Sequence, residues 1–318
     1  MISIFRRELR SYFDSLMGFG IIGAFYVLMM LLSVAMDPGG QGGDWFRRGE
    51  LSMRAFFSIF PWVAAVIVPA VSMKLWAEDR RQSTFEMLMT LPIPAWKVAL
   101  GKYFAGVAFV FLMLFSTIQL PLIMPLLGTP DWGPIIGGYV ACLLLGAAFV
   151  AIGLFISGLT ENQALAFFLS MLVCVGLVGL SEVRPLMAGL ARDNPAVATV
   201  IFVSTPLMLI GGFVGAVVRD RTMVFGSLVG WGVLNVLAYL VFPAYSPQPD
   251  DVSNSAKLLD WLSNALVVAS AQISITEHFN LTERGVIYSD GLIFIVSLVV
   301  FFLLMNVWSI EGRRFGRW

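Results

Sequence analysis

The chain has 318 residues, of which 58% are hydrophobic and only 13% are charged, whereas an ordinary soluble domain has about 25% charged residues. Positive and negative residues balance at 20 each, and the single histidine argues against a histidine-based metal cluster. This composition excludes an ordinary soluble enzyme and is typical of an all-α integral membrane protein, a polytopic bundle of helices.

The first 15 residues predict an amphipathic helix that lies at the membrane surface. Apolar Ile2, Phe5 and Leu9 recur at helical spacing, and charged residues fill the other faces. The apolar run that follows, residues 16–36, is longer than the core of a signal peptide, and no small-residue cleavage site comes after it. We therefore expect an uncleaved anchor.

About eight apolar runs are long enough to cross a hydrocarbon core of about 30 Å. They are residues 16–36, 56–76, 103–127, 135–159, 164–180, 196–218, 223–242 and 291–310. Glu161 and Asn162 form a short turn between the fourth and fifth runs, which predicts helix capping. Cys142 and Cys174 lie in apolar runs, so we expect two small buried side chains rather than a disulfide or a metal site.

The lysines and arginines predict the orientation of these runs. With the N-terminus in the cytoplasm, most of the basic residues fall on the cytoplasmic side, and an even number of spans brings the C-terminus there too. Two polar segments would then lie outside: the glycine-rich residues 37–50 and a longer extracytoplasmic loop, residues 243–290. We expect one transmembrane domain over residues 1–318.

The most polar stretch of the first half, residues 72–106, separates the second and third runs. Its charges have both signs, and one charge at the bilayer centre costs about 2.5–3.5 kcal/mol, so the stretch should lie outside the membrane. Pro92 and Pro94 interrupt its helical pattern. The sequence therefore predicts two short helices, the second from Trp96 to Lys102, joined by a proline elbow at the membrane surface.

Signatures of chemistry are missing from the sequence. It contains no P-loop, no G-x-S-x-G and no H-E-x-x-H motif. None of the apolar runs carries at its centre the pair of ionisable residues that an ion or proton relay needs. We therefore expect a permease body with no catalytic residue, no metal site and no enzymatic activity, whose energy comes from another protein that docks on residues 72–106.

Two stretches resemble a known family. Residues 78–88 (EDRRQSTFEML), followed by Thr90-Leu91-Pro92 and then Gly101-Lys102, resemble the hallmark of type-2 ABC transporter (ABC-2) permeases, although Ser83 stands where that family usually has glycine. Residues 278–290, before the final run, resemble the gliding-motility (GldF-like) branch. Permeases of that branch typically have six spans, so residues 181–257 are interpreted as an insertion that adds a hairpin to a six-helix core.

The resemblance implies a permease subunit of an ATP-driven transporter, an exporter or a mechanical transmission, in the cell inner membrane. A homodimer or heterodimer of permeases would pair with a cytosolic ATPase, which would bind the ATP and Mg²⁺, and an auxiliary membrane protein could join them. This chain would need no cofactor, and we expect no nucleic-acid partner.

The same resemblance implies two sets of site residues. The cytoplasmic coupling segment, residues 77–102, would contact the ATPase through Glu78, Asp79, Arg80, Thr84, Glu86, Pro92, Gly101 and Lys102. An extracytoplasmic motif that orders the outer loop would consist of His278, Phe279, Arg284, Gly285 and Asp290.

Alternatives stay open at this point. The charges of the coupling segment could simply solvate an interfacial helix. The whole protein could be a non-transporting scaffold of a motility or cell-surface machine, or a secondary transporter that is coupled to an ion gradient.

Overall fold

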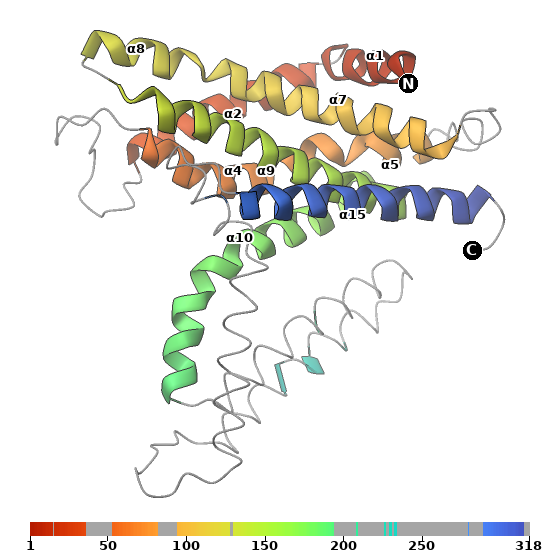
Figure 1. Cartoon of the computed structure of the whole chain (residues 1–318). Helices are drawn as coiled ribbons and strands as arrows, with labels where there is room; N and C mark the ends of the chain where they lie inside the picture. Colours follow the sequence, from red (N-terminus) through yellow and green to blue (C-terminus); the bar gives the residue numbers. More distant parts are fainter. Residues whose placement is uncertain are drawn as a thin grey trace, which may run out of the picture. The chain divides into compact units, whose positions relative to one another are not determined.

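The computed structural model describes residues 1–14, 16–35, 53–81, 94–127, 130–193 and 289–314, together with isolated residues at 208, 226, 229–230, 232–233 and 279. Over these residues the chain is helical, with turns between the helices, so the predicted all-α class is confirmed (Figure 1). The helices are α1 (Ile2–Phe13), α2 (Leu16–Ala35), α4 (Arg54–Ser72), α5 (Lys74–Arg81), α7 (Ala95–Ser116), α8 (Gln119–Leu127), α9 (Trp132–Leu159), α10 (Gln163–Asp193) and α15 (Ser289–Arg314).

The chain divides into two compact units. Unit 1 comprises Met1–Val178 and Ile275–Trp318, and unit 2 comprises Gly179–Ser274. The predicted insertion, residues 181–257, begins within α10, and the runs at 196–218 and 223–242 lie outside the described residues apart from isolated positions. The insertion and those two spans therefore stay predictions, as do the outer segments at 37–50 and 243–290.

Five helices among the described residues are long and apolar enough to cross a membrane. They are Leu16–Ser33, Arg54–Arg81, Ala95–Leu126, Trp132–Leu159 and Gly291–Gly312. The apolar part of α10, Gln163–Gly179, is shorter and coincides with the predicted fifth run. The predicted apolar runs thus located these helices. A helix that crosses a bilayer must be apolar along its whole length rather than on one face, so the length of a run identifies it.

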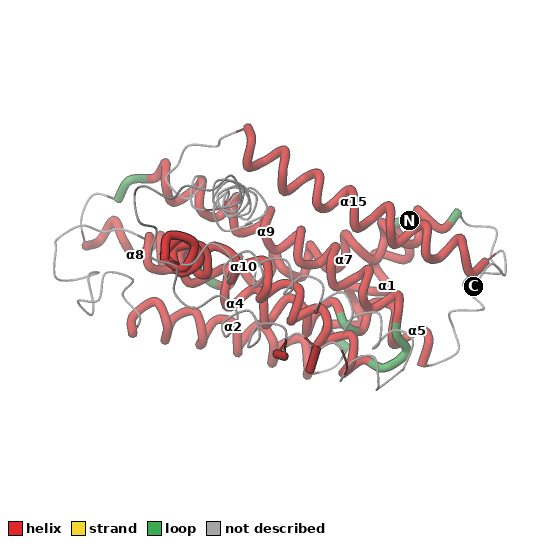
Figure 2. The backbone as a smooth tube through the Cα atoms, turned by 90° about the horizontal axis from the view of Figure 1, so that it is seen from below, coloured by secondary structure: helices red, strands yellow, loops and turns green. Residues whose placement is uncertain are grey.

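Helix α9 lies at the centre of unit 1. Of its most apolar stretch, 78% is buried, against 17% for α15, and it packs against α4, α5, α7 and α15. Figure 2 shows α15 on one side of α9 and α4 with α2 on the other. Glycines allow this close packing: a Cβ on Gly146 would lie 2.6 Å from Val110 Cγ1 of α7.

Helix α15 is attached to α9 by a polar contact as well as by apolar packing. The buried Asn306 side chain donates through Nδ2 to the carbonyl oxygen of Leu154, 3.1 Å away. Gly158 makes room for it, because a Cβ there would lie 3.2 Å from Asn306 Nδ2. A hydrogen bond of this kind between apolar helices fixes their register where apolar packing alone would tolerate sliding.

The predicted third run, residues 103–127, coincides with the second part of the candidate span Ala95–Leu126 and is interrupted once. The helix breaks at Thr117 and Ile118, between α7 and α8. Pro121 is the cause, because it has no N–H for the carbonyl of Thr117 four residues earlier. The Thr117 oxygen accepts instead from the backbone N–H of Leu120 at 3.0 Å and from the Tyr139 hydroxyl of α9 at 3.1 Å. The Thr117 carbonyl at the helix break therefore keeps a hydrogen-bond partner.

Two smaller predictions are confirmed. Asn162 caps α10, since its Oδ1 accepts from the backbone N–H of Ala164 at 3.0 Å. Cys142 of α9 and Cys174 of α10 are fully buried.

Candidate functional site

The polar segment at residues 72–106 differs from the predicted pair of short surface helices. The first helix, α5, follows α4 directly, and together they form the candidate span Arg54–Arg81. The second begins at Ala95 and continues without a break to Ser116 as α7. The segment between them, residues 82–93, lies outside the described residues and includes Thr84, Glu86 and Pro92. The segment is thus joined at both ends to long helices of the bundle.

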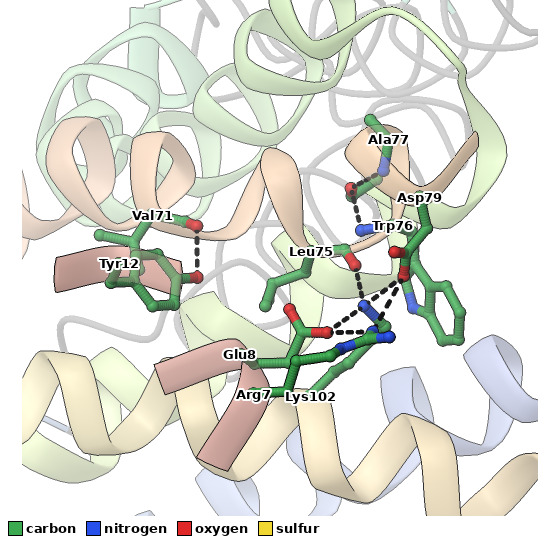
Figure 3. A network of polar contacts seen from close by, with 10 residues as sticks. Arg7, Glu8, Tyr12, Val71, Leu75, Trp76, Ala77, Asp79 and Lys102 are labelled. Atoms are coloured by element: carbon green, nitrogen blue, oxygen red, sulfur yellow. Dashed lines mark hydrogen bonds and ion pairs between the residues drawn. The ribbon is translucent and has the colours of Figure 1, made fainter. Parts of the chain in front are cut away.

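Lys102 of α7 forms the centre of a buried charge cluster at this end of the bundle (Figure 3). Its side chain is 1% exposed, and its Nζ lies 2.9 Å from Glu8 Oε1 of α1 and 2.6 Å from Asp79 Oδ2 of α5. It also donates to the carbonyl oxygen of Leu75, 2.5 Å away. One ammonium group therefore holds three helices together.

Arg7 completes the cluster. Its guanidinium lies 2.6 Å from Glu8 Oε1 and 3.7 Å from Asp79 Oδ2. Two cations thus face two carboxylates, so the formal charges of Arg7, Glu8, Asp79 and Lys102 cancel. Arg7 is 51% exposed, so the typical cost of about 3–5 kcal/mol for removing one member of a buried ion pair applies to the pairs of Lys102 and not to those of Arg7.

The glycine before Lys102 explains how α1 comes so close. A Cβ on Gly101 would lie 3.1 Å from Ile4 Cγ2 and 3.3 Å from the carbonyl oxygen of Met1. Both Gly101 and Lys102 are buried. In this structure Gly101 admits α1 and Lys102 binds it, and the role of these two residues in coupling to an ATPase stays a prediction.

Tyr12 fastens the other end of α1. Its hydroxyl donates to the carbonyl oxygen of Val71, 2.8 Å away, and the Lys74 ammonium lies 3.9 Å from its ring centroid. Burial raises the pKa of Tyr12, so the hydroxyl keeps the proton that it donates. Val71 lies in the last turn of α4, where carbonyls have no partner within the helix.

Tyr12→Phe is expected to destabilise the protein by about 1 kcal/mol, because it removes the donor to Val71 and little else. Thermal unfolding of the purified protein in detergent measures the effect. Tyr26→Phe is the matched control, since the Tyr26 hydroxyl contacts Gln119 at an exposed position. Equal unfolding temperatures for the two variants would contradict the assignment.

Ser157 of α9 fastens the start of α5. Its Oγ accepts from the backbone N–H groups of Trp76 and Ala77, each at 3.1 Å, and donates to the Met73 carbonyl at 2.7 Å. The first N–H groups of a helix have no partner within it and need acceptors from elsewhere. Ser157 therefore acts as an N-cap that another helix supplies.

The remaining described residues of the predicted coupling set lie on α5. Glu78 accepts from Arg81 at 3.0 Å and from the Gln163 side chain, which connects α5 to the start of α10. Arg81 is exposed, and Arg80 is half-buried. The exposed charge of α5 is thus Arg81, the last described residue before residues 82–93.

Sequence reasoning missed Arg7, Glu8, Tyr12 and Ser157. Glu8 and Lys102 are separated by 94 residues, and Ser157 and Trp76 by 81, so no local pattern connects them. One signal was present. Lys102 lies within a helix that carries no acidic residue, and a buried lysine requires a carboxylate partner from elsewhere.

The predicted extracytoplasmic motif is described at two positions only. Phe279 is fully buried and stacks on Phe60 of α4, with ring centroids 6.4 Å apart. Asp290 lies in the first turn of α15. His278, Arg284 and Gly285 lie outside the described residues. The motif therefore contributes an aromatic anchor to unit 1, and its other roles stay predictions.

A family model described as "ABC-2 family transporter protein" matches residues 51–218, just over half of the chain. The match includes α4, α5, α7 and α9. The residues through which Lys102 and Ser157 contact α5 therefore lie within the matched range. No curated protein matches the chain. The chain belongs to the ABC-2 transporter family and is a multi-pass membrane protein, the permease component of an ABC transporter.

Proposed function

We propose that this permease is driven by a separate cytosolic ATPase that docks on the coupling segment, residues 77–102, and that it exports its substrate. Permeases of the ABC-2 family normally pair with an ATPase subunit. The resemblance of residues 78–102 to the family hallmark supports the docking position, and the export direction follows from the same resemblance.

The observation that supports this proposal is the attachment of the segment at both ends. Residues 82–93 connect α5 to α7, and each of these helices continues into a candidate span. Ser157 and Lys102 fix the two ends to the bundle through buried polar contacts. A push on such a segment displaces whole helices, whereas a push on a loosely tethered loop would only bend the loop.

The charges of the segment suit a protein partner. Arg81 is 65% exposed, and the sequence places Glu86 five residues further on. Charges of both signs in one segment favour a specific orientation and rapid association with a complementary surface.

Glu86→Lys is expected to reduce co-purification of the ATPase and its stimulated turnover about tenfold or more, a loss of about 1.4 kcal/mol of binding free energy. Affinity capture of the membrane complex, followed by ATP-hydrolysis measurements in nanodiscs, provides the test. Glu311→Lys is the matched control, because it reverses an exposed charge in the last turn of α15, outside the coupling segment. Full turnover in the Glu86→Lys complex would argue against docking at this segment.

Finer assignments belong to the same proposal. We place the protein in the cell inner membrane, as a homodimer or heterodimer of permeases, with ATP and Mg²⁺ bound by the partner ATPase. The gliding-motility branch is supported by residues 278–290 alone. A complex that assembles with its partners but moves no solute in vesicles would favour the scaffold alternative.

A further inference from the structure

We propose that α1 is a moving part of the transmission, and that Glu8, Asp79 and Lys102 are positioning residues that make it move together with the coupling segment. This inference rests on the proposed function and extends it. In it, α1 is required for converting ATP hydrolysis into helix movement, but not for binding the ATPase.

The first argument is the geometry at Lys102. An ammonium group has three donors, and here they face Glu8 Oε1, Asp79 Oδ2 and the Leu75 carbonyl at 2.9, 2.6 and 2.5 Å. The partners come from α1 and α5, while the lysine itself belongs to α7. Two hydrogen bonds and an ion pair meet at this buried ammonium group, so the three helices are held in one arrangement rather than in several.

The second argument is the direction of the charges on α1. Glu8 is the single acidic residue within α1, and its side chain is 13% exposed. Arg6 and Arg10 are exposed. A helix that merely rested on the membrane surface would have no need for an inward carboxylate, since burying an unpaired charge is unfavourable. Glu8 is placed to bind Lys102, not to face headgroups.

The third argument is that α1 is attached along its whole length. Ile4 and Met1 contact Gly101 at the start of the helix, Glu8 binds Lys102 in the middle, and Tyr12 bonds to Val71 at the end. The Tyr12 ring also packs against Phe109 of α7, with centroids 4.6 Å apart. These attachments hold α1 to α7 and, through Val71, to the end of α4, so α1 moves together with them as one body.

The test begins with Lys102→Met, which keeps the length of the side chain and removes its charge. In the complete complex with the ATPase, reconstituted in nanodiscs, we expect the stimulated ATP turnover per captured ATPase to fall about tenfold or more. Glu8→Gln is the milder second variant, since it keeps a polar partner for Lys102, and we expect a reduction in the same direction.

A cysteine pair then separates transmission from folding. Ile4 Cβ lies 3.2 Å from the position of a Cβ on Gly101, so the two helices must separate by only a few tenths of an ångström to reach the Cβ–Cβ range of about 3.5–4.5 Å in disulfides. Cys142 and Cys174 are buried, so they do not compete for oxidation. Combined with Lys102→Met, the pair Ile4→Cys and Gly101→Cys should restore at least half of the turnover on oxidation, and reduction should remove it again. The same pair in the Lys102 background is the control.

The outcomes separate the two proposals. Wild-type turnover in the Lys102→Met complex, or a formed disulfide that leaves turnover low, would overturn the role of α1 and leave docking intact. Failure of the unaltered chain to capture any ATPase would overturn the proposed function and this inference together.

Discussion

Ser157→Ala is expected to detach α5 from α9 and to abolish most of the ATPase-stimulated activity. The substitution removes one acceptor for the Trp76 and Ala77 N–H groups and one donor for the Met73 carbonyl. A buried polar group left unsatisfied costs about 1–3 kcal/mol, and three such groups meet at this hydroxyl. The start of the coupling segment would then lose its fixed position while the rest of the bundle remains.

Hydrogen exchange over residues 73–81 provides the direct measurement, together with ATP turnover of the reconstituted complex. Faster exchange in these residues, with the core of α9 unchanged, is the expected result. Ser116→Ala is the matched control, because the Ser116 hydroxyl bonds only within its own helix, to the carbonyl of Met113. If both variants exchanged and turned over alike, the capping role of Ser157 would be refuted.

Gly153→Val is expected to prevent stable packing of α4 on α9. A Cβ at position 153 would lie 1.8 Å from Ser72 Oγ and 2.6 Å from Ser72 Cβ, so rotation of the serine hydroxyl alone cannot relieve the clash. Overpacking a dense core costs about 1–3 kcal/mol, and an overlap with Cβ lies at the upper end of that range or above it. The helices must separate, so we expect a large loss of folded protein.

Yield of monodisperse protein and thermal unfolding in detergent report this effect. Gly176→Val in α10 is the control, since a Cβ there meets no atom within 4 Å. A double variant, Ser72→Gly with Gly153→Ala, should recover much of the stability that Gly153→Ala alone loses. Removing the Ser72 side chain from α4 makes room for the new Cβ on α9. Absence of any recovery would show that the close approach at Gly153 is not the cause.

The sequence predicted the spanning helices of unit 1 because the length of an apolar run alone determines whether it can span. Prediction from the sequence failed where contacts between distant helices determine the structure. The break at Thr117 could have been inferred, since Pro121 cannot donate to the carbonyl four residues earlier, but the hydrogen bond from Tyr139 to that carbonyl could not. Gly101 and Lys102 were interpreted as surface residues because they close a polar segment. Their position inside α7 and the partner on α1 depend on packing between helices far apart in the chain.

The separation of Glu8 from Lys102 also has a consequence for biosynthesis. Glu8 leaves the ribosome 94 residues before its partner, so α1 cannot take its final position until α7 has been synthesised and inserted. In the interval its carboxylate must remain hydrated, which an amphipathic helix at the surface allows and a spanning helix would not. The amphipathic character of the first 13 residues thus serves a waiting state during synthesis as well as the finished bundle.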